Sequence, residues 1–403
     1  MKKQKRRKEK GITLVALVVT IIVLIILAGV TLNLTIRQNG IFSRAETAAN
    51  TWRNAEQNEQ LAMGELEELM DGYLNGNSGN QGGENEEYNT ATTVVDAISQ
   101  NKPFEFDTTI TDSCEPANSV RVPAGFKIAQ ESATLVENGI VIEDTDGNQF
   151  VWIPADTGDG QTVNMSNGEN TKIVYERVNF GKQNDIYSNY TENLSEDEKS
   201  SVEKWKGYYI GRYEAGDGEA INNNGEKELR TSSSPQTHKV IIQKNQVPYN
   251  WITFDNAIVR AEEMSRIQSY TATTKLASSY AWDTAIKFIQ LKNSNYGTTS
   301  PEGNYTNSET FNYIDINEIE QQGPNNDIVP TGQTKAVSNI YDLGGNLWEY
   351  TSERKINTGS PYVVRGGAYD VSYLDFPAGS RNNFNGIENE TAGFRIALYC
   401  NIN

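Results

Sequence analysis

The sequence predicts an α+β protein in which a long N-terminal helix precedes a loop-rich outer domain. Three features carry this prediction. Residues 11–36 are an uncharged apolar run, residues 75–90 contain no aliphatic side chain, and the rest of the chain alternates short apolar segments with turn residues. Few helices among many loops and short strands indicate an α+β domain.

The composition limits the chemistry that the chain can support. Its 403 residues are 37% hydrophobic and carry a net charge of −18, so the chain can bury a core but lacks the Lys/Arg surface of a nucleic-acid binder. A single histidine, His238, excludes paired-histidine catalysis and histidine-rich metal sites. We expect His238 to be an ordinary surface or strand-edge residue. Two cysteines, Cys114 and Cys400, cannot build a four-thiolate zinc site.

The amino end predicts a membrane segment. Residues 1–10 hold seven Lys/Arg and one acid, and the next 26 residues hold no charge. As a helix this run is about 39 Å long, which exceeds the roughly 30 Å hydrocarbon core of a bilayer. The preceding positive charge predicts a cytoplasmic amino end and an extracellular outer domain. A secretory signal has a shorter apolar region, of about 7–15 residues.

The basic leader, followed by the apolar run, resembles the class III leader of type IV pilins and pseudopilins. The resemblance implies processing between Gly11 and Ile12 and a pilin-like helix over residues 12–36. One position departs from the family: Ala16 stands where pilins carry the glutamate used in filament assembly. A minor pilin subunit and a plain membrane-anchored protein therefore both remain open.

Four segments are expected between the membrane and the end of the chain. Small or apolar residues recur close to a 3.6 period over residues 37–74, which predicts a stalk helix. Residues 75–90 are a flexible linker of Asn, Gly and Glu. Residues 91–135 are a lead-in with a short helix near 93–99, and residues 136–403 form the outer domain.

Local patterns predict the elements of the outer domain. Residues 139–143 and 149–153 read as a hairpin around an Asp-Gly turn, and residues 207–213 as a strand. Apolar spacing predicts one helix that starts near Thr253 and a second around residues 280–289. Trp348 and Tyr350, two residues apart, should point to one face of a strand.

Eight segments of the outer domain, in order, resemble the formylglycine-generating enzyme (sulfatase-modifying factor) family. They are FVWIPA (150–155), GYYIGRYE (207–214), WITFDNA (251–257), KLASSYAW (275–282), NIYDLGGNLWEYT (339–351), VRGGAY (364–369), AGSR (378–381) and GFR (393–395). The resemblance covers roughly residues 140–400 and implies a C-type-lectin-like fold. We expect most of these residues to hold the fold, with Arg395 paired to a buried carbonyl or carboxylate.

The resemblance also predicts that the chain is not an enzyme. Family catalysis needs two redox-active cysteines downstream of the RGG turn, and those positions hold Val371 and Phe376. The related iron-dependent branch needs several histidines. Cys114 and Cys400 lie near the two ends of the outer domain, where either a disulfide or two free thiols would fit. A divergent oxidase remains a weaker alternative.

Calcium is the one cofactor that we retain. The family binds calcium near its NxWEW motif, and this resemblance implies oxygen ligands from Asn339, Asp342, Asn346 and Glu349. Asp and Asn in loops also cap turns, which is the simpler reading of the same residues.

The segment between RGG and GFR predicts a binding surface, because it is rich in Tyr, Asn and Ser. C-type-lectin-fold proteins of this kind are targets of diversity-generating retroelements, which vary this stretch. The resemblance implies a contact surface made of Asp370, Ser372, Tyr373, Asp375, Asn382, Asn383, Phe384 and Asn385. An ordinary polar loop is the alternative.

Together these patterns predict an adhesin-like protein of the cell surface, anchored in the membrane or a pilus. It would bind a protein or glycan on another cell or a phage. A minor pilin or pseudopilin, assembled with other pilin subunits, is the main alternative.

Overall fold

The computed structural model describes residues 89–112, 118–181, 189–268 and 270–402. The chain divides into two compact units, Met1–Asn85 and Glu86–Asn403. The predicted leader, the Gly11–Ile12 processing site, the membrane helix, the stalk and most of the linker lie outside the described residues. In the part that the structure describes, no helix is long and apolar enough to cross a membrane.

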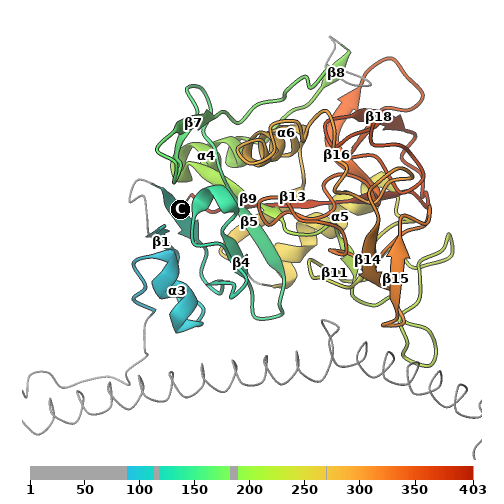
Figure 1. Ribbon diagram of the computed structural model, residues 1–403, viewed down its shortest axis with the longest axis horizontal. Helices are drawn as coiled ribbons and strands as arrows, with labels where there is room; N and C mark the ends of the chain where they lie inside the picture. The colour runs from blue at the N-terminus through green and yellow to red at the C-terminus, as the bar shows by residue number, and fades with distance from the viewer. Residues whose placement is uncertain (1–88, 113–117, 182–188, 269, 403) are drawn as a thin grey trace, which may run out of the picture. The chain divides into compact units, whose positions relative to one another are not determined.

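A six-stranded antiparallel sheet forms the centre of the second unit (Figure 1). Its strand order is β13 (Ala272–Leu276), β20 (Ile396–Cys400), β9 (Gly207–Gly211), β5 (Gln149–Pro154), β4 (Val141–Glu143) and β3 (Lys127–Ile128). The hairpin predicted around the Asp-Gly turn is confirmed as β4 and β5, and the strand predicted at 207–213 is β9.

Both faces of this sheet are covered. Successive side chains of a strand point to opposite faces. On β9, the Tyr208 hydroxyl donates to Ala281 O of helix α6 (Ser279–Ile289) at 2.5 Å, and the Tyr209 hydroxyl donates to Arg121 O at 2.6 Å. Arg121 belongs to β2 (Ser119–Val122), which pairs with β1 (Thr108–Thr111). Helix α6 thus lies on one face and the β1–β2 hairpin on the other.

The lead-in segment belongs to the same core as the rest of the unit. Helix α3 (Val94–Gln100) confirms the short helix predicted near 93–99. Thr93 and Asp96 form a reciprocal capping box at its start, which satisfies two backbone amides that the helix leaves open. Val94, Ile110 and Phe126 from this segment are fully buried in the main hydrophobic cluster.

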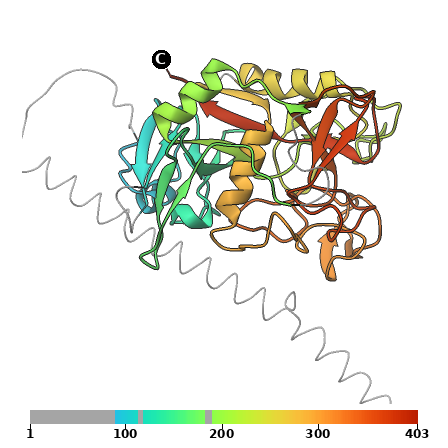
Figure 2. The ribbon, with the colours of Figure 1, turned by 90° about the horizontal axis from the view of Figure 1, so that it is seen from above.

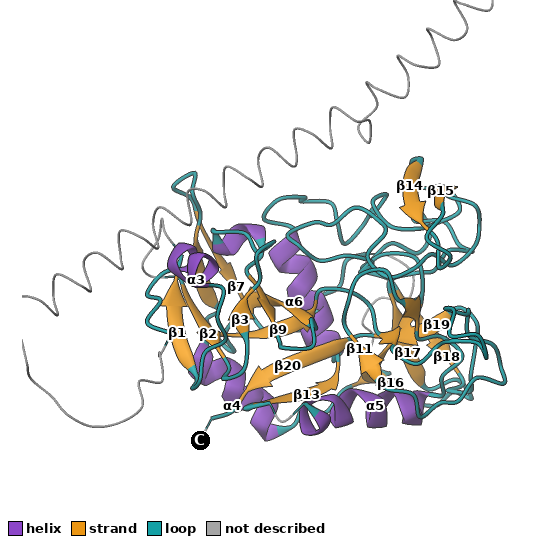
Figure 3. Cartoon of the chain, turned by 90° about the horizontal axis from the view of Figure 1, so that it is seen from below, coloured by secondary structure: helices purple, strands orange, loops and turns teal. Residues whose placement is uncertain are grey.

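Side-chain caps fix where the longer helices begin. Helix α4 (Glu196–Trp205) starts after Ser195, α5 (Phe254–Ile267) after Thr253 and α6 after Ser278, and each cap accepts a hydrogen bond from the third residue beyond it. Both helices predicted from apolar spacing are therefore confirmed. Figure 3 shows α5 running beside β13.

A second sheet carries the segment of functional interest. Its strands are β18 (Arg381–Phe384), β17 (Tyr362–Arg365), β16 (Trp348–Lys355) and β19 (Ala392–Phe394), with β8 (Tyr190–Thr191) paired to the far end of β16. Strand β16 runs parallel to β19 and antiparallel to β17.

The register of this sheet separates two faces. Arg365 pairs with Arg381 and Val363 with Asn383, whereas Val364 pairs with Asn382 and Tyr362 with Phe384. We call the side of Arg365 and Arg381 the arginine face, and the side of Tyr362, Phe384, Trp348 and Tyr350 the aromatic face. The rings of Trp348 and Tyr350 both lie 6.3 Å from the Phe384 ring, which confirms that they share a face.

Small ribbons and one short helix complete the unit. They are β6 (Gln161–Asn164) with β7 (Asn170–Ile173), β10 (Gly216–Asp217) with β11 (Val240–Ile241) and β12 (Val247–Pro248), β14 (Phe311–Ile314) with β15 (Glu320–Gly323), and the 3-10 helix η1 (Val136–Asn138). Figure 2 shows the blue N-terminal part of the unit at one end and the β14–β15 hairpin at the other.

Candidate functional site

The structure brings part of the predicted contact surface together on the aromatic face. Asn382 and Phe384 lie on this face of β18 and are half-buried, and the Phe384 ring lies beside the rings of Trp348 and Tyr350. Phe376, at the end of the preceding loop, packs edge-on against Trp348 with ring centroids 5.3 Å apart. Trp348 is thus the point where the loop and the strand meet.

Asn383 lies on the opposite, arginine face. Its Oδ1 accepts a hydrogen bond of 3.0 Å from the Tyr190 hydroxyl of β8. The alternation of a strand requires this, because Asn382 and Asn383 are adjacent residues. Asn383 therefore supports the sheet from the arginine face, whereas its neighbours Asn382 and Phe384 lie on the aromatic face.

The loop over residues 366–380 presents the other predicted positions. Asp370 and Asp375 are exposed, and Ser372 and Tyr373 are half-buried. The Tyr373 amide donates to Asn307 Oδ1 at 3.0 Å, and its ring meets the Tyr305 ring at 6.0 Å. The loop is therefore held in place by residues that the sequence did not single out.

Two glycines shape the start of this loop. Gly366 and Gly367 have φ of +91° and +76°, a region that other residues rarely adopt. A Cβ on Gly367 would lie 2.4 Å from Phe376 O. This glycine pair therefore allows a close backbone approach.

Residues 385–391 return the chain along the aromatic face. Asn385 is exposed and its Oδ1 accepts from the Ile387 amide at 3.2 Å. The Phe254 amide donates to Gly386 O, and the Tyr350 hydroxyl donates to Ile387 O at 3.2 Å. The return loop is thus tied to α5 and β16.

A buried ion cluster holds the arginine face. Arg365 Nη2 lies 2.5 Å from Asp283 Oδ1, and Arg381 contacts both Asp283 and Glu353. The two arginines hold the pKa of Glu353 below its ordinary value despite its burial. Sequence reasoning missed Asp283 and Glu353. A signal was present for Asp283, since it lies among Ala281, Trp282, Ala285 and Ile286 in a predicted amphipathic helix, and a charge among apolar residues is buried only when it is paired.

The positions implied for the catalytic cysteines hold packed apolar side chains. Val371 and Phe376 are half-buried and pack against the main hydrophobic cluster. Cys400 is a buried free thiol whose pKa is raised, chiefly by burial, and a neutral thiol is a poor nucleophile. Cys114 lies outside the described residues.

The four residues predicted to bind calcium are close in the chain but do not fit a calcium ion as they stand. Glu349 uses both carboxylate oxygens on Arg395, at 2.7 and 2.9 Å, which confirms the predicted pairing of Arg395. Asp342 accepts from Gly332 N and Thr334 Oγ1, and Asn346 Oδ1 accepts from Asn304 and Val329.

Asn339 is occupied in the same way, since its Oδ1 accepts from Arg212 at 3.2 Å. Within the described ranges, no group of three or more His, Cys, Asp or Glu side chains is placed to hold a metal ion. Calcium binding at these residues stays a prediction that this geometry does not support.

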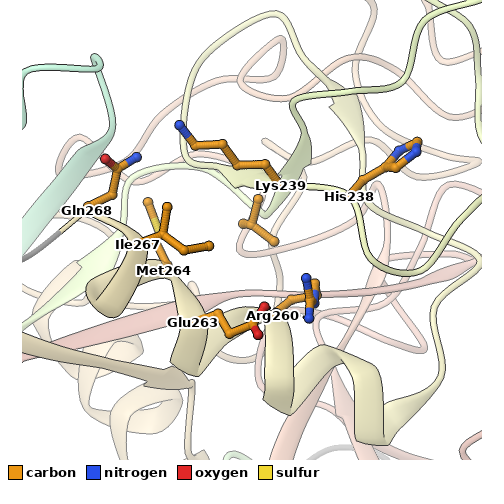
Figure 4. Close-up of a pocket in the computed structure, with 8 residues that line it drawn as sticks. His238, Lys239, Arg260, Glu263, Met264, Ile267 and Gln268 are labelled. Carbon is orange, nitrogen blue, oxygen red and sulfur yellow. Dashed lines mark ion pairs between the residues drawn. The ribbon is translucent and has the colours of Figure 1, made fainter.

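Two hollows lie away from the predicted contact residues. One, of about 10 Å³, has room for about one water molecule and is lined by His238, Arg260 and Met264, among others (Figure 4). The other, of about 180 Å³, is lined by Glu198 and Lys275 together with the end of β20. His238 itself is held by Asp217, with Nδ1 2.8 Å from Oδ2.

Comparison with solved structures returns distant likenesses. CarF is 14% identical, with 48% of this chain and 87% of that chain covered and a TM-score of 0.32. Treponema denticola variable protein 1 is 13% identical, with 63% and 96% covered and a TM-score of 0.32. PvdO from Pseudomonas aeruginosa is 13% identical, with 64% and 97% covered and a TM-score of 0.34. At these scores the likenesses carry no argument about function.

A search of curated proteins finds no match to this chain. The family model described as the sulfatase-modifying factor enzyme 1-like domain matches residues 88–399, a span that includes both sheets except the last residue of β20, and all eight predicted contact residues. The chain therefore belongs to the sulfatase-modifying factor enzyme 1-like family.

Proposed function

We propose that this chain is a non-catalytic ligand-binding protein, displayed on the cell surface in the manner of an adhesin. The observation that carries the proposal is the chemistry of one loop. Val371 and Phe376 fill the positions implied for the catalytic cysteines and pack into the core, while Asp370 and Asp375 beside them face solvent. The loop has lost the groups for oxidation and keeps the groups for contact.

In this proposal the contact surface is redefined as the exposed and half-buried residues of 369–376, 382 and 384–390, which adds the neighbours of the predicted residues and leaves out Asn383. Tyrosine and phenylalanine offer rigid contact area, and Asn, Asp and Ser offer adaptable hydrogen bonds. The buried cluster of Arg365, Arg381 and Asp283 supports this surface from beneath. A rigid base with polar, half-buried positions above it suits recognition, because little conformational freedom is lost on binding.

The proposal includes an anchor at the amino end. The apolar run of residues 12–36 would hold the protein in the membrane or a pilus, with the outer domain outside the cell. The ligand would be a protein or glycan on another cell or a phage. Neither a cofactor nor nucleic acid has a part in this function.

The experiment that tests the proposal is deep sequencing of the gene's 3′ end across a natural population of the host. We expect substitutions to concentrate at those codons of 370–390 whose side chains face solvent. Codons for the buried Arg365 and Arg381, and for Asn383 on the arginine face, should stay unchanged and serve as the internal control. A low and even frequency of substitutions along these codons would show that the surface is not diversified, and the protein would then be a receptor for one fixed ligand.

A biochemical test separates binding from filament assembly. The full-length protein and the variant Asp370→Ala/Tyr373→Ala/Asn382→Ala would be applied to arrays of glycans and bacterial surface proteins. We expect a ligand that the wild type retains and the triple variant loses. Co-purification with pili, without any array ligand, would favour the minor-pilin alternative over the proposal.

A further inference from the structure

We propose that the contact surface extends onto residues 303–327 and that the joined surface docks a partner protein rich in Lys and Arg. This inference rests on the proposed function, since it names the partner class of the same site. We call the exposed residues of 303–327 and 369–390 together the extended surface.

Hydrogen bonds and ring contacts join the two segments. The Thr306 amide donates to Val371 O at 3.0 Å, and the Tyr373 amide donates to Asn307 Oδ1 at 3.0 Å. The Tyr305 ring meets the Tyr373 ring edge-on at 6.0 Å. Figures 2 and 3 place the β14–β15 hairpin at the same end of the unit as β17 and β18. A partner that covers Asp370 to Tyr373 would therefore also meet residues 306 and 307.

Exposed apolar side chains occur on both segments. Ile314 and Ile319, at the end of the β14–β15 hairpin, are 38% and 55% exposed. Leu374 and Ile387, in the two C-terminal loops, are 55% and 58% exposed. Exposed apolar side chains dispersed among polar ones are typical of a surface that contacts a macromolecule.

The charge of both segments has one sign. None of the 35 Lys and Arg residues lies between positions 293 and 334, and the only one between 366 and 391 is Arg381. Arg381 is buried in its contacts with Asp283 and Glu353. The exposed acids of the extended surface are Glu309, Glu318, Glu320, Asp327, Asp370, Asp375 and Glu390.

Acids of the two segments come together around one tyrosine. Burial, followed by the charges of Glu390, Asp370 and Asp327, raises the pKa of Tyr369 to about 12. Asp327 belongs to the first segment and the other two acids to the second, so their fields overlap. Complementary charge is what steers a partner and fixes its orientation, and a Lys/Arg-rich surface supplies it.

The test uses the full-length protein and an array of peptides in three sets with equal apolar content and with positive, zero or negative net charge. We expect the positive set to bind at least about tenfold more tightly than the negative set. Raising NaCl from about 50 to about 500 mM should weaken that binding by about tenfold or more, because the charges are exposed.

Three charge-matched variants locate the binding. The loop variant is Asp370→Lys/Asp375→Lys/Glu390→Lys, the hairpin variant is Glu309→Lys/Glu318→Lys/Asp327→Lys, and the control is Glu196→Lys/Asp197→Lys/Glu262→Lys. We expect the first two each to lose about tenfold in affinity for the positive peptides and the control to lose less than about twofold. Thermal melting of each variant checks that the domain stays folded.

Each of the other outcomes overturns a specific part of the inference or of the proposed function. Loss in the loop variant alone removes the extension to residues 303–327 and leaves the proposed function intact. Equal binding of all three peptide sets, lost in the loop variant, removes the cationic partner class but not the contact surface. Binding that none of the variants alters overturns both the inference and the proposed surface. Binding of no peptide set overturns the cationic class.

Discussion

The two faces of the β17–β18 strand pair differ in burial and charge, although residues of the two faces are adjacent in the chain. On the arginine face, Arg365 and Arg381 are fully buried and every charge has a partner on another element. On the aromatic face, Asn382 and Phe384 are half-exposed. Because side chains alternate along a strand, one short ribbon can anchor a binding surface and also form part of it.

This contrast indicates which positions of β17 and β18 can be substituted without loss of stability. Removing one partner of a buried ion pair leaves an uncompensated charge in the interior, which is strongly destabilising. A half-exposed position on the aromatic face has no such dependence. Along β17 and β18, we therefore expect substitutions to be tolerated on the aromatic face and not on the arginine face, whatever the residue type at each position.

The largest expected effect comes from the arginine face. Asp283→Asn removes the carboxylate that Arg365 and Arg381 share, and we expect a loss of about 3–5 kcal/mol in the free energy of unfolding. Urea unfolding would measure it. The matched control, Asn382→Ala on the aromatic face, should change stability by less than about 0.5 kcal/mol. Similar small losses in both variants would mean that the two faces do not differ.

A pH effect comes second. Glu192 sits beside the cluster, where it accepts hydrogen bonds from Ser352 and Ser279, and its other oxygen is buried without a partner. Burial, followed by the nearby Glu353 charge, raises the pKa of Glu192 from 4.5 to about 8. The folded protein therefore holds a proton that the unfolded chain releases, and this group makes stability fall as pH rises from about 4.5 to about 8.

The variant Glu192→Gln would remove this dependence. We expect it to be more stable than the wild type at pH 8, by about 1–2 kcal/mol because the side chain is only half-buried, and equal to it at about pH 5. Thermal melts across this range would measure the difference. Glu196→Gln, on the exposed start of α4, is the control and should change stability neither at pH 8 nor at about pH 5. If the melting temperatures of the wild type and Glu192→Gln changed with pH in parallel, Glu192 would not be the group responsible for the pH dependence.

The next prediction compares two adjacent asparagines. Asn383→Ala deprives the Tyr190 hydroxyl of an acceptor and should cost about 1 kcal/mol, while Asn382→Ala should leave stability nearly unchanged. Ligand binding should show the reverse order, with Asn382→Ala weakening it and Asn383→Ala leaving it unchanged. Equal effects of the two substitutions on binding would remove the distinction between the faces.

Local rules predicted the elements around this hairpin well. Thr253, Trp348 and Tyr350 each sit where short-range spacing placed them, because caps and strand alternation depend on neighbours in the chain. Spacing could not predict that Asn383 turns to Tyr190 of β8, since a register is set by pairing between distant strands.

The same limit applies to the partners of the site. Asp283 and Arg381 are 98 residues apart, and Asn307 reaches Tyr373 across 66 residues. No local pattern marks such contacts. The anchor and its processing site rest on sequence alone, because residues 1–88 lie outside the described part of the chain.

The smallest expected effect concerns calcium and extends the comparison to another buried arginine. Arg395 occupies both oxygens of Glu349 and also donates to Gly211 O and Tyr341 O, so it already supplies the positive charge that a cation would bring. Burial still raises the pKa of Glu349 to about 7 against the pull of Arg395, so the Glu349 carboxylate depends on Arg395 for its charge balance. We expect EGTA to leave the melting temperature of the purified protein unchanged, with Mg²⁺ addition as the control. A drop in melting temperature that Ca²⁺ alone reverses would mean that the Glu349–Arg395 pair opens to admit the ion, and that the ligands predicted from the sequence are used.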